Sequence, residues 1–394
     1  MAVEEKFEEG QYGFRPERGT TDAIFSLKLL MEKRWEWDQL VYIAFVDLEK
    51  AFDRLPRKMI WDTLEDPIYD VDRLLVRAIK SLYRKCASAV RTQTREDNWF
   101  DVNSGVRQGG VISPLLFVLF MDRCMKNLRS GEGVITLAYA DDIALVANNP
   151  IELQNALAAW NSALKRAKMK INTNKTEVMM VARQREEIEI WLEGEKLKLV
   201  EEFKYLGVKI DERCQMEKEI LNRIQCHTNN LRTLYPLMRE KLIPMQVKIT
   251  IYKTILRPVL TYGSETWTLT ERLKSKIQAA EMRVLRIIKG VTRCDKIRNE
   301  EIRRELEIEP ILEYVERSQL RWFGHVMRMN EQQYPVKYYQ WQPQGKRPTG
   351  RPRKRWRDGI RQAIEARGGT MEEVEREQLY ADRALWRDFV RHHH

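Results

Sequence analysis

Three aspartates stand where carboxylates could do metal chemistry. Asp141 and Asp142 are adjacent between two apolar runs, in the stretch ITLAYADDIALVA from 135 to 147. A third, Asp47, comes near the end of the apolar run VYIAFVDL at 41 to 48. Such runs are typical of buried strands, and a carboxylate at the end of one must be solvated, paired or bound to a metal, because an isolated buried charge is very costly.

Acidic residues are also common in hairpin turns, so Asp141 and Asp142 alone leave an ordinary solvated turn as an alternative. Asp47 changes this interpretation. If its strand lies beside the hairpin, Asp47 and Asp141 converge at one edge of the sheet and repel each other unless a divalent cation lies between them. Hard oxygen ligands with room for water favour Mg²⁺, with Mn²⁺ as a substitute. A two-metal carboxylate site activates a hydroxyl and stabilises a leaving phosphate, as nucleotidyl transfer requires.

The elements around these aspartates predict a mixed fold. Strand-like runs lie at 41 to 48, on both sides of Asp141 and Asp142, and at 202 to 210. Apolar residues three and four positions apart predict amphipathic helices at 22 to 35 and 151 to 168. Because strands and helices mix without strict alternation, residues 1 to 214 are predicted to form an α+β domain with a small antiparallel sheet.

Two further zones follow. Residues 215 to 290 are predicted to be helical throughout, with basic residues opposite each apolar stripe, as in a small bundle. Residues 291 to 394 are charged and irregular, and their centre is GKRPTGRPRKRWRDGIR at 345 to 361. Its prolines and glycines forbid a continuous helix before about Trp356. The three final histidines look like a tag remnant and are left out of the functional interpretation.

Charge is unevenly distributed along the chain. The net charge is +11, with 33 Lys+Arg against 35 Asp+Glu in residues 1 to 214, and 36 against 23 in residues 215 to 394. The halves therefore carry −2 and +13. A one-sided basic balance is the electrostatic footprint of a polyanion binder, with nucleic acid the usual partner. A solvated surface with spare lysines is the alternative.

Location is predicted from what the sequence lacks. No apolar run approaches the roughly 18 residues of a membrane span, and the acidic start MAVEEKFEEG has none of the features of a signal peptide. The five cysteines are scattered without a CxxC pair, which is typical of reduced thiols. We therefore expect a soluble intracellular protein.

Six motifs occur in a recognisable order. They are QYGFRPERGTTDAI (11 to 24), AFVDLEKAFD (44 to 53), GVRQGGVISPLLF (105 to 117), AYADD (138 to 142), KMKINTNKTEVM (168 to 179) and FKYLGVKI (203 to 210). Together they resemble the fingers-end, A, B, C, D and E motifs of a reverse transcriptase. The residues within the motifs resemble those of the non-LTR retrotransposon (LINE-like) branch. YGSETWTLT (262 to 270), LRWFGHVMRM (320 to 329) and the basic segment resemble the C-terminal region of such elements, so the resemblance covers residues 11 to about 361.

The resemblance implies a polymerase right-hand palm with partial fingers at 1 to 214, a helical thumb at 215 to 290, and a basic helical C-terminal extension at 291 to 394. It implies an RNA-directed DNA polymerase in the nucleus that extends a primer 3′-hydroxyl with dNTPs, using an RNA template and a DNA primer or target. Such enzymes carry more fingers sequence upstream. Arg15 and Arg18 are the nearest basic residues that could touch a nucleotide or template, and a partner could supply the missing fingers. The alternative is a domesticated or truncated relative that binds nucleic acid without polymerase activity.

Site residues carried over from the resemblance fall into three groups. The metal ligands would be Asp47 and Asp141, with Asp142 assisting the primer end or the second metal. The nucleotide-binding residues would be Phe52, which rejects a 2′-hydroxyl, Arg107, Gln108 and Gly109 at the incoming nucleotide and templating base, and Lys175 as proton donor to pyrophosphate. The primer grip would be Tyr205, Leu206 and Gly207. For Phe52, Lys175 and the Tyr-Leu-Gly turn, the alternatives are a core aromatic, a solvated loop lysine and simple packing.

The basic segment has several interpretations. TGRPRKRWR at 349 to 357 contains Gly-Arg-Pro, similar to the AT-hook element of A·T-rich minor grooves, and would equally serve as a nuclear import signal. A solvated linker is the third interpretation. The residues predicted to bind nucleic acid are Arg351, Arg353, Lys354 and Arg355. The tryptophans among the basic residues, Trp322, Trp341 and Trp356, could stack on bases if exposed, or anchor a small helical core.

Overall fold

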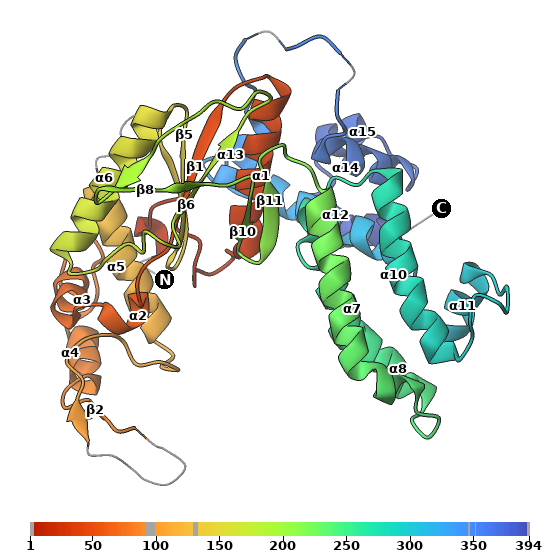
Figure 1. Ribbon diagram of the computed structural model, residues 1–394, viewed down its shortest axis with the longest axis horizontal. Helices are drawn as coiled ribbons and strands as arrows, with labels where there is room; N and C mark the ends of the chain where they lie inside the picture. The colour runs from red at the N-terminus through yellow and green to blue at the C-terminus, as the bar shows by residue number, and fades with distance from the viewer. Residues whose placement is uncertain (1–3, 91–98, 129–132, 346, 351, 392–394) are drawn as a thin grey trace. The chain divides into compact units, whose positions relative to one another are not determined.

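The computed structural model describes residues 4 to 90, 99 to 128, 133 to 345, 347 to 350 and 352 to 391 (Figure 1). By packing, the chain forms two compact units. The N-terminal unit contains Met1–Ala23 and Asp38–Leu206, and the C-terminal unit contains Ile24–Trp37 and Gly207–His394. Helix α1 (Thr20–Glu36) begins in the first unit and continues into the second. The division predicted at 214 and 290 stays a prediction.

A five-stranded sheet forms the centre of the N-terminal unit. Its strands, in spatial order, are β4 (Ile135–Tyr139), β5 (Asp142–Ala147), β1 (Val41–Val46), β6 (Glu177–Val181) and β9 (Lys198–Leu199). All six residues of β1 are buried, because β1 lies in the middle of the sheet with both faces covered. The first four strands are antiparallel neighbours, whereas β9 runs parallel to β6. The prediction of an α+β fold with a small antiparallel sheet is confirmed for β4, β5, β1 and β6, whereas the short β9 pairs parallel to β6.

Helices and short strands complete this unit. They are η1 (Glu4–Lys6), α2 (Ala51–Arg54), α3 (Arg57–Leu64), α4 (Arg73–Leu82), β2 (Ala87–Ser88), β3 (Phe100–Asp101), α5 (Ser113–Asn127), α6 (Pro150–Arg166), β7 (Trp191–Leu192), β8 (Glu195–Lys196) and β10 (Glu202–Tyr205). Helices α5 and α6 bury their apolar residues in one core with one face of β1. On the other face, Phe45 of β1 stacks on Phe203 of β10 with ring centroids 3.9 Å apart. The sheet is therefore held from both sides.

The C-terminal unit is mainly helical. After β11 (Val208–Asp211) come α7 (Glu217–Arg239), α8 (Met245–Ile251), η2 (Tyr252–Leu256), α9 (Arg257–Thr261), η3 (Ser264–Thr266), α10 (Glu271–Lys289), α11 (Asn299–Leu306), α12 (Ile311–Met327), α13 (Tyr334–Gln340), α14 (Trp356–Glu365), α15 (Met371–Arg376) and α16 (Arg383–Arg391). Figure 1 shows α7 and α10 side by side, and Ile220 and Ile277 of these helices are buried in one cluster. The helical prediction for 215 to 290 is confirmed.

The zone after 291 is more regular than its sequence indicates. Helices α11 to α16 occupy much of its described part, so the prediction of an irregular zone is wrong, and the helical C-terminal extension that the resemblance implies is confirmed. Its apolar residues are widely spaced among charges, and they become a core only when the helices pack together. The predicted start of a helix at Trp356 is confirmed, because α14 begins there. Across the described ranges, no helix combines the length and apolarity needed to cross a membrane.

Candidate active site

The register of the sheet brings Asp47 to the hairpin. Strand β1 pairs antiparallel with β5, and Val46 is the partner of Ile143. The next residues along, Asp47 and Asp142, therefore stand opposite each other at the same end of the two strands. Side chains in such positions are neighbours, and like charges there repel. The predicted pairing of the strand at 41 to 48 with the hairpin is confirmed.

The turn of the hairpin carries the third carboxylate. Tyr139 pairs with Asp142, so Ala140 and Asp141 form a two-residue connection between β4 and β5. Ala140 has φ +57°, a left-handed conformation that favours glycine, yet this alanine is only 3% exposed. The surrounding structure must hold the turn in this form, and Asp141 is placed by it.

The electrostatics of the three carboxylates reflect their proximity. The pKa of Asp142 is raised to about 6, first by partial burial and then by the charges of Asp141 and Asp47. The pKa of Asp141 is also raised, first by burial and then by the charge of Asp47. Lys175 offsets part of this charge, with its Nζ 3.8 Å from Asp47 Oδ2. Ionised carboxylates that raise one another's pKa are stabilised by a nearby cation.

These oxygen donors suit a hard divalent cation in kind and charge. Within the described ranges, however, no group of three or more Asp, Glu, His or Cys side chains is close enough together to hold a metal ion. The structure therefore supplies the carboxylate donors without defining a coordination geometry.

A pocket of about 370 Å³ lies in the N-terminal unit. Its lining residues are Phe52, Val106, Arg107, Gln108, Gly109, Gly110, Val111, Ser113 and Pro114. Four of the five residues predicted to bind nucleotide are among them: Phe52, Arg107, Gln108 and Gly109. The fifth, Lys175, lies instead beside Asp47.

Phe52 shows features of both interpretations offered for it. It belongs to α2, which begins four residues after Asp47, and it is half-buried. Its ring stacks on the buried Phe117 of α5, with centroids 4.3 Å apart and planes 23° apart. The ring is thus supported by the core while it also lines the pocket. A supported aromatic wall of this kind can reject a bulkier ligand, because it cannot easily swing away.

The loop that carries Gln108 is fastened to α2. Val106 N donates to Phe52 O at 3.0 Å, and Gly105 N donates to Leu55 O at 2.8 Å. Gly105 has φ +77°, and a Cβ there would lie 2.5 Å from Asp53 O, so only glycine allows this approach. The loop and the helix after Asp47 therefore form one rigid corner.

Sequence reasoning missed Asp53. Gln108 Nε2 donates to Asp53 Oδ1 at 3.0 Å, which fixes the orientation of the predicted nucleotide-contacting amide. The signal was present in AFVDLEKAFD, whose last residue is Asp53, but nothing in the sequence links it to Gln108. Arg107 is also directed by unpredicted partners, since its guanidinium donates to Cys86 Sγ at 3.3 Å and lies 5.8 Å from the Tyr83 ring centroid.

The predicted primer grip begins with Tyr205 and Leu206, the last residues of the N-terminal unit, and ends with Gly207 of the C-terminal unit. Tyr205 is 2% exposed, and its hydroxyl donates to Leu137 O of β4 at 3.3 Å. Leu206 and Gly207 follow with φ +46° and +83°, so they form a turn that needs left-handed backbone. Tyr205 therefore packs as the alternative interpretation requires, and the primer-grip role of the three residues stays a prediction.

Comparison with known proteins decides the family. Residues 1–210, more than half of the chain, match the model of the family described as reverse transcriptase (RNA-dependent DNA polymerase). The chain belongs to the reverse transcriptase family.

Several relatives of this reverse transcriptase come from mobile elements. A transposon-derived protein of Caenorhabditis elegans is 26% identical, over 66% of this chain and 97% of its own length. The RNA-directed DNA polymerases of the X-element and of jockey, both of Drosophila melanogaster, are 25% and 24% identical over 81% and 76% of this chain. The chain spans only 36% and 33% of those two relatives. The predicted resemblance to the non-LTR branch is confirmed.

Among solved structures, telomerase from Candida tropicalis is similar at 12% identity, over 86% of this chain and 59% of that one. The TM-score is 0.42, and at that level the likeness carries no argument. The fold of this reverse transcriptase is therefore described from its own elements and its family.

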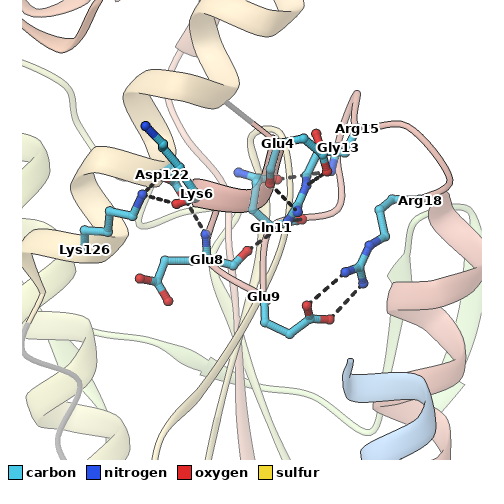
Figure 2. Close-up of polar contacts among 10 residues, drawn as sticks. All are labelled: Glu4, Lys6, Glu8, Glu9, Gln11, Gly13, Arg15, Arg18, Asp122 and Lys126. Atoms are coloured by element: carbon cyan, nitrogen blue, oxygen red, sulfur yellow. Dashed lines mark hydrogen bonds and ion pairs between the residues drawn. The ribbon is translucent and has the colours of Figure 1, made fainter. Parts of the chain in front are cut away.

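Two arginines of the reverse transcriptase do not take the role expected of them. The side chain of Arg15 is 6% exposed and ion-paired to Glu4 at 2.7 Å, and that of Arg18 is 7% exposed and ion-paired to Glu9 at 2.8 Å (Figure 2). Because both guanidiniums are buried and already bound, neither is placed to clamp a triphosphate. Their ordinary role is to hold the N-terminal segment together.

The basic segment of the reverse transcriptase contacts its own unit. Arg351 lies outside the described residues. The Arg353 guanidinium lies 4.7 Å from the Trp35 ring centroid of α1, Lys354 donates to Gln362 Oε1 at 2.8 Å, and Arg355 is ion-paired to Asp358 at 3.0 Å. The first contact holds the segment against α1, and the other two hold it against α14. Binding of nucleic acid by these residues stays a prediction.

The tryptophans near this segment act as anchors. Trp322 is 9% exposed and Trp356 is 3% exposed, and both rings pack against Phe25 of α1, at 5.7 and 4.7 Å between centroids. The alternative of a small helical core is therefore correct for these two residues, and stacking on bases is excluded for them in this conformation. Trp341 is half-buried beneath the Arg34 guanidinium.

The protonation state of Glu32 makes the stability of this packing depend on pH. The Glu32 carboxylate accepts from Trp356 N at 3.0 Å. Its pKa is raised to about 7, chiefly by burial and further by the charges of Glu36 and Asp358. A folded-state pKa above the unfolded value of 4.5 means that the folded unit holds the proton more tightly. Its contribution is therefore full below pH 4.5 and is lost as the pH rises towards 7.

We expect the free energy of unfolding of the C-terminal unit to fall by about 2 kcal/mol from this group between pH 4.5 and 8, allowing for its partial exposure. Glu32→Gln should remove that share of the pH dependence. Urea unfolding at pH 5 and pH 8 measures it, with the exposed Glu331→Gln as the matched control. Equal pH dependence in wild type and Glu32→Gln would contradict the prediction.

Proposed function

We propose that this reverse transcriptase is an active RNA-directed DNA polymerase, which extends a primer 3′-hydroxyl with dNTPs on an RNA template. The observation that carries the proposal is the convergence of Asp47, Asp141 and Asp142 at one end of β1 and the β4–β5 hairpin. A second feature supports it. The chain leads from Asp47 directly into α2, whose Phe52 lines a pocket with Gln108. A polymerase needs both parts, a set of carboxylates for chemistry and a pocket for the nucleotide.

In the proposed reaction, the primer 3′-oxygen attacks the α-phosphate of a dNTP in line, the bond from that phosphate to pyrophosphate breaks, and the hydroxyl proton passes to solvent water. Asp47 and Asp141 would hold Mg²⁺, or Mn²⁺ in its place, and a bound divalent cation supplies charge neutralisation and a lowered hydroxyl pKa. Asp142 assists beside them. Lys175, whose Nζ lies 3.8 Å from Asp47 Oδ2, would donate a proton to the departing pyrophosphate.

The pocket residues would select the substrate. The Phe52 ring, backed by Phe117, would reject a nucleotide that carries a 2′-hydroxyl. Gln108, oriented by Asp53, would contact the incoming nucleotide and the templating base. Gly109 has φ +78° and no heavy atom within 4 Å of where a Cβ would lie, so backbone conformation, and not space, requires glycine there.

The basic half of the chain would hold the nucleic acid. Residues 215 to 394 carry a net charge of +13, which favours an RNA template and a DNA primer or target as partners. We also propose a nuclear location, because such a polymerase would act on target DNA.

Primer extension tests the function directly. Wild type and the double variant Asp141→Ala, Asp142→Ala are compared on poly(rA)/oligo(dT) with dTTP and Mg²⁺. We expect metal-dependent extension by wild type and none above background by the variant. Equal products from both would refute the proposal, and salt-sensitive binding without extension would favour a nucleic-acid-binding protein that lacks polymerase activity.

The sugar selectivity of the pocket should change in Phe52→Val. Removal of the ring opens space where the 2′-hydroxyl would lie, so we expect the preference for dTTP over UTP to fall by about 10- to 100-fold, with dTTP incorporation little changed. Single-nucleotide incorporation kinetics measure it. The matched control is Phe100→Val, an exposed phenylalanine outside the pocket. An unchanged preference in Phe52→Val would remove the selective role from Phe52.

A further inference from the structure

An N-terminal segment lies along the edge of the catalytic hairpin. Tyr12 N donates to Ala138 O at 2.8 Å, and Ala138 N donates to Gly10 O at 2.7 Å. Gln11 and Ala138 form a parallel bridge. Strand β4 is the edge strand of the five-stranded sheet, so residues 10 to 13, which we call the brace, occupy the otherwise unpaired side of β4. The brace thereby runs towards the turn that carries Asp141.

The brace touches that turn at Gly13. A Cβ on Gly13 would lie 2.5 Å from Ala140 N, closer than real Cβ contacts occur. Gly13 is not among the residues with positive φ, so the requirement for glycine is one of space and not of backbone conformation. The neighbouring atom belongs to the backbone, so no flexible side chain can move aside. A side chain at 13 must displace either the brace or the turn with Ala140 and Asp141.

The brace is clamped by Arg15 (Figure 2). The Arg15 guanidinium donates to Gln11 O at 2.8 Å, to Glu8 O at 3.0 Å and to Glu4 Oε1 at 2.7 Å. The fork of the guanidinium suits this task, because a single ammonium could not hold several acceptors in fixed directions. Gln11 also turns back on the brace, with its Oε1 accepting from Gly13 N at 3.1 Å.

The clamp is in turn anchored to the core (Figure 2). Glu8 N donates to Asp122 Oδ1 at 2.6 Å, and Asp122, which is fully buried in α5, is ion-paired to Lys126 at 2.7 Å. The Tyr69 hydroxyl donates to the other oxygen of the same carboxylate at 2.7 Å. These contacts therefore hold the brace in place relative to α5, one of the helices that pack against the sheet.

We propose that Gly13 is a positioning residue for the Asp141 turn, and that the brace, clamped by Arg15, holds this turn in its left-handed form. The inference rests on the proposed polymerase function for its consequence in catalysis. The claim that the brace holds the turn concerns the hairpin alone and does not depend on that function. Displacement of a catalytic group by about 1 Å can lower a rate about 100-fold, so a brace of this kind has a large effect without any contact with substrate.

The test compares Gly13→Ala, Arg15→Lys and Gly19→Ala. Gly19 is the matched control, because a Cβ there would have its nearest neighbour at 3.7 Å and its φ is not left-handed. Amide hydrogen exchange of peptides spanning 135 to 147 is followed by mass spectrometry in the absence of nucleic acid and metal. We expect exchange in these peptides to accelerate about tenfold in Gly13→Ala and Arg15→Lys, and to stay at the wild-type rate in Gly19→Ala.

Primer extension gives the second readout. In Gly13→Ala we expect kcat to fall between about 10- and 100-fold, with KM for dTTP within about threefold of wild type, because the pocket is not altered. Should Gly13→Ala fail to fold, Arg15→Lys decides, since it introduces no clash. Wild-type exchange at 135 to 147 in both variants would overturn the inference. Absence of extension by wild type would refute the proposed function and leave the exchange comparison valid.

Discussion

Asp141→Asn should abolish primer extension while leaving the protein folded. The amide keeps the shape of the side chain but loses the charge that a divalent cation requires, and a metal–carboxylate interaction is worth several kcal/mol in the transition state. We therefore expect a loss of at least about 1,000-fold in kcat. Burial and the charge of Asp47 raise the pKa of Asp141, so its ionised form is disfavoured in the fold, and the neutral variant should melt at the wild-type temperature or slightly above it.

A loss of activity without a loss of stability in Asp141→Asn would distinguish a catalytic role of Asp141 from a structural one. Single-turnover extension with dTTP measures the first, and thermal melting measures the second. The matched control is Asp70→Asn, an exposed residue of the same unit with φ +50°, a backbone conformation that asparagine accepts. Asp70→Asn should extend primers within about twofold of wild type. Substantial extension by Asp141→Asn would remove Asp141 from the metal site.

Arg303→Met should have the largest effect on stability. Glu281 is fully buried, its Oε2 accepts from Arg303 at 2.7 Å, and its Oε1 accepts from the Tyr252 hydroxyl at 3.1 Å. Burial raises the pKa of Glu281, while the Arg303 guanidinium opposes that rise. Removal of the arginine leaves a buried charge uncompensated, which costs about 3 to 5 kcal/mol. We expect urea unfolding of the C-terminal unit at pH 8 to show that loss.

A second substitution should repair much of the damage. In Arg303→Met the pKa of Glu281 rises further, so the variant should recover stability as the pH falls and the carboxyl takes up a proton. Arg303→Met combined with Glu281→Gln should recover more than half of the loss at pH 8, because no buried charge remains. The control is Arg376→Met, which breaks an exposed ion pair with Glu377 and should cost less than about 1 kcal/mol. A double variant as unstable as Arg303→Met would contradict the buried-charge explanation.

Much of the site could be predicted because it follows from local sequence. Uninterrupted apolar runs define β1 and β5, since strands buried on both faces leave no polar positions. The motifs then place Phe52 and Gln108 at fixed distances along the chain, and the pocket confirms that they meet. The start of α14 at Trp356 was equally local, because prolines and glycines before it preclude a helix.

What the sequence could not provide were contacts between residues far apart in the chain. The bond from Gln108 to Asp53 spans 55 positions, and that from Glu8 to Asp122 spans 114. Nothing in either local stretch selects the partner, because an exposed glutamine or a helical aspartate has many compatible environments. Arg15 is the clearest case. Its place in the sequence made it a candidate for binding nucleotide. Only the structure shows that its buried guanidinium instead donates to Glu4 and to the backbone carbonyl of Gln11.

The sequence by itself therefore determined the family, the strands around the three aspartates and the helical character of residues 215 to 290, because these depend on residue types at fixed spacing. Only the tertiary structure decided how Asp141 is held, since the left-handed turn at Ala140 is stable only with the surrounding contacts in place. The tertiary structure also shows that part of the charge of the basic segment is ion-paired within its own unit. The physical reason is the same in both cases. Close packing and charge pairing depend on distances in space, which the spacing of residues along the chain does not fix.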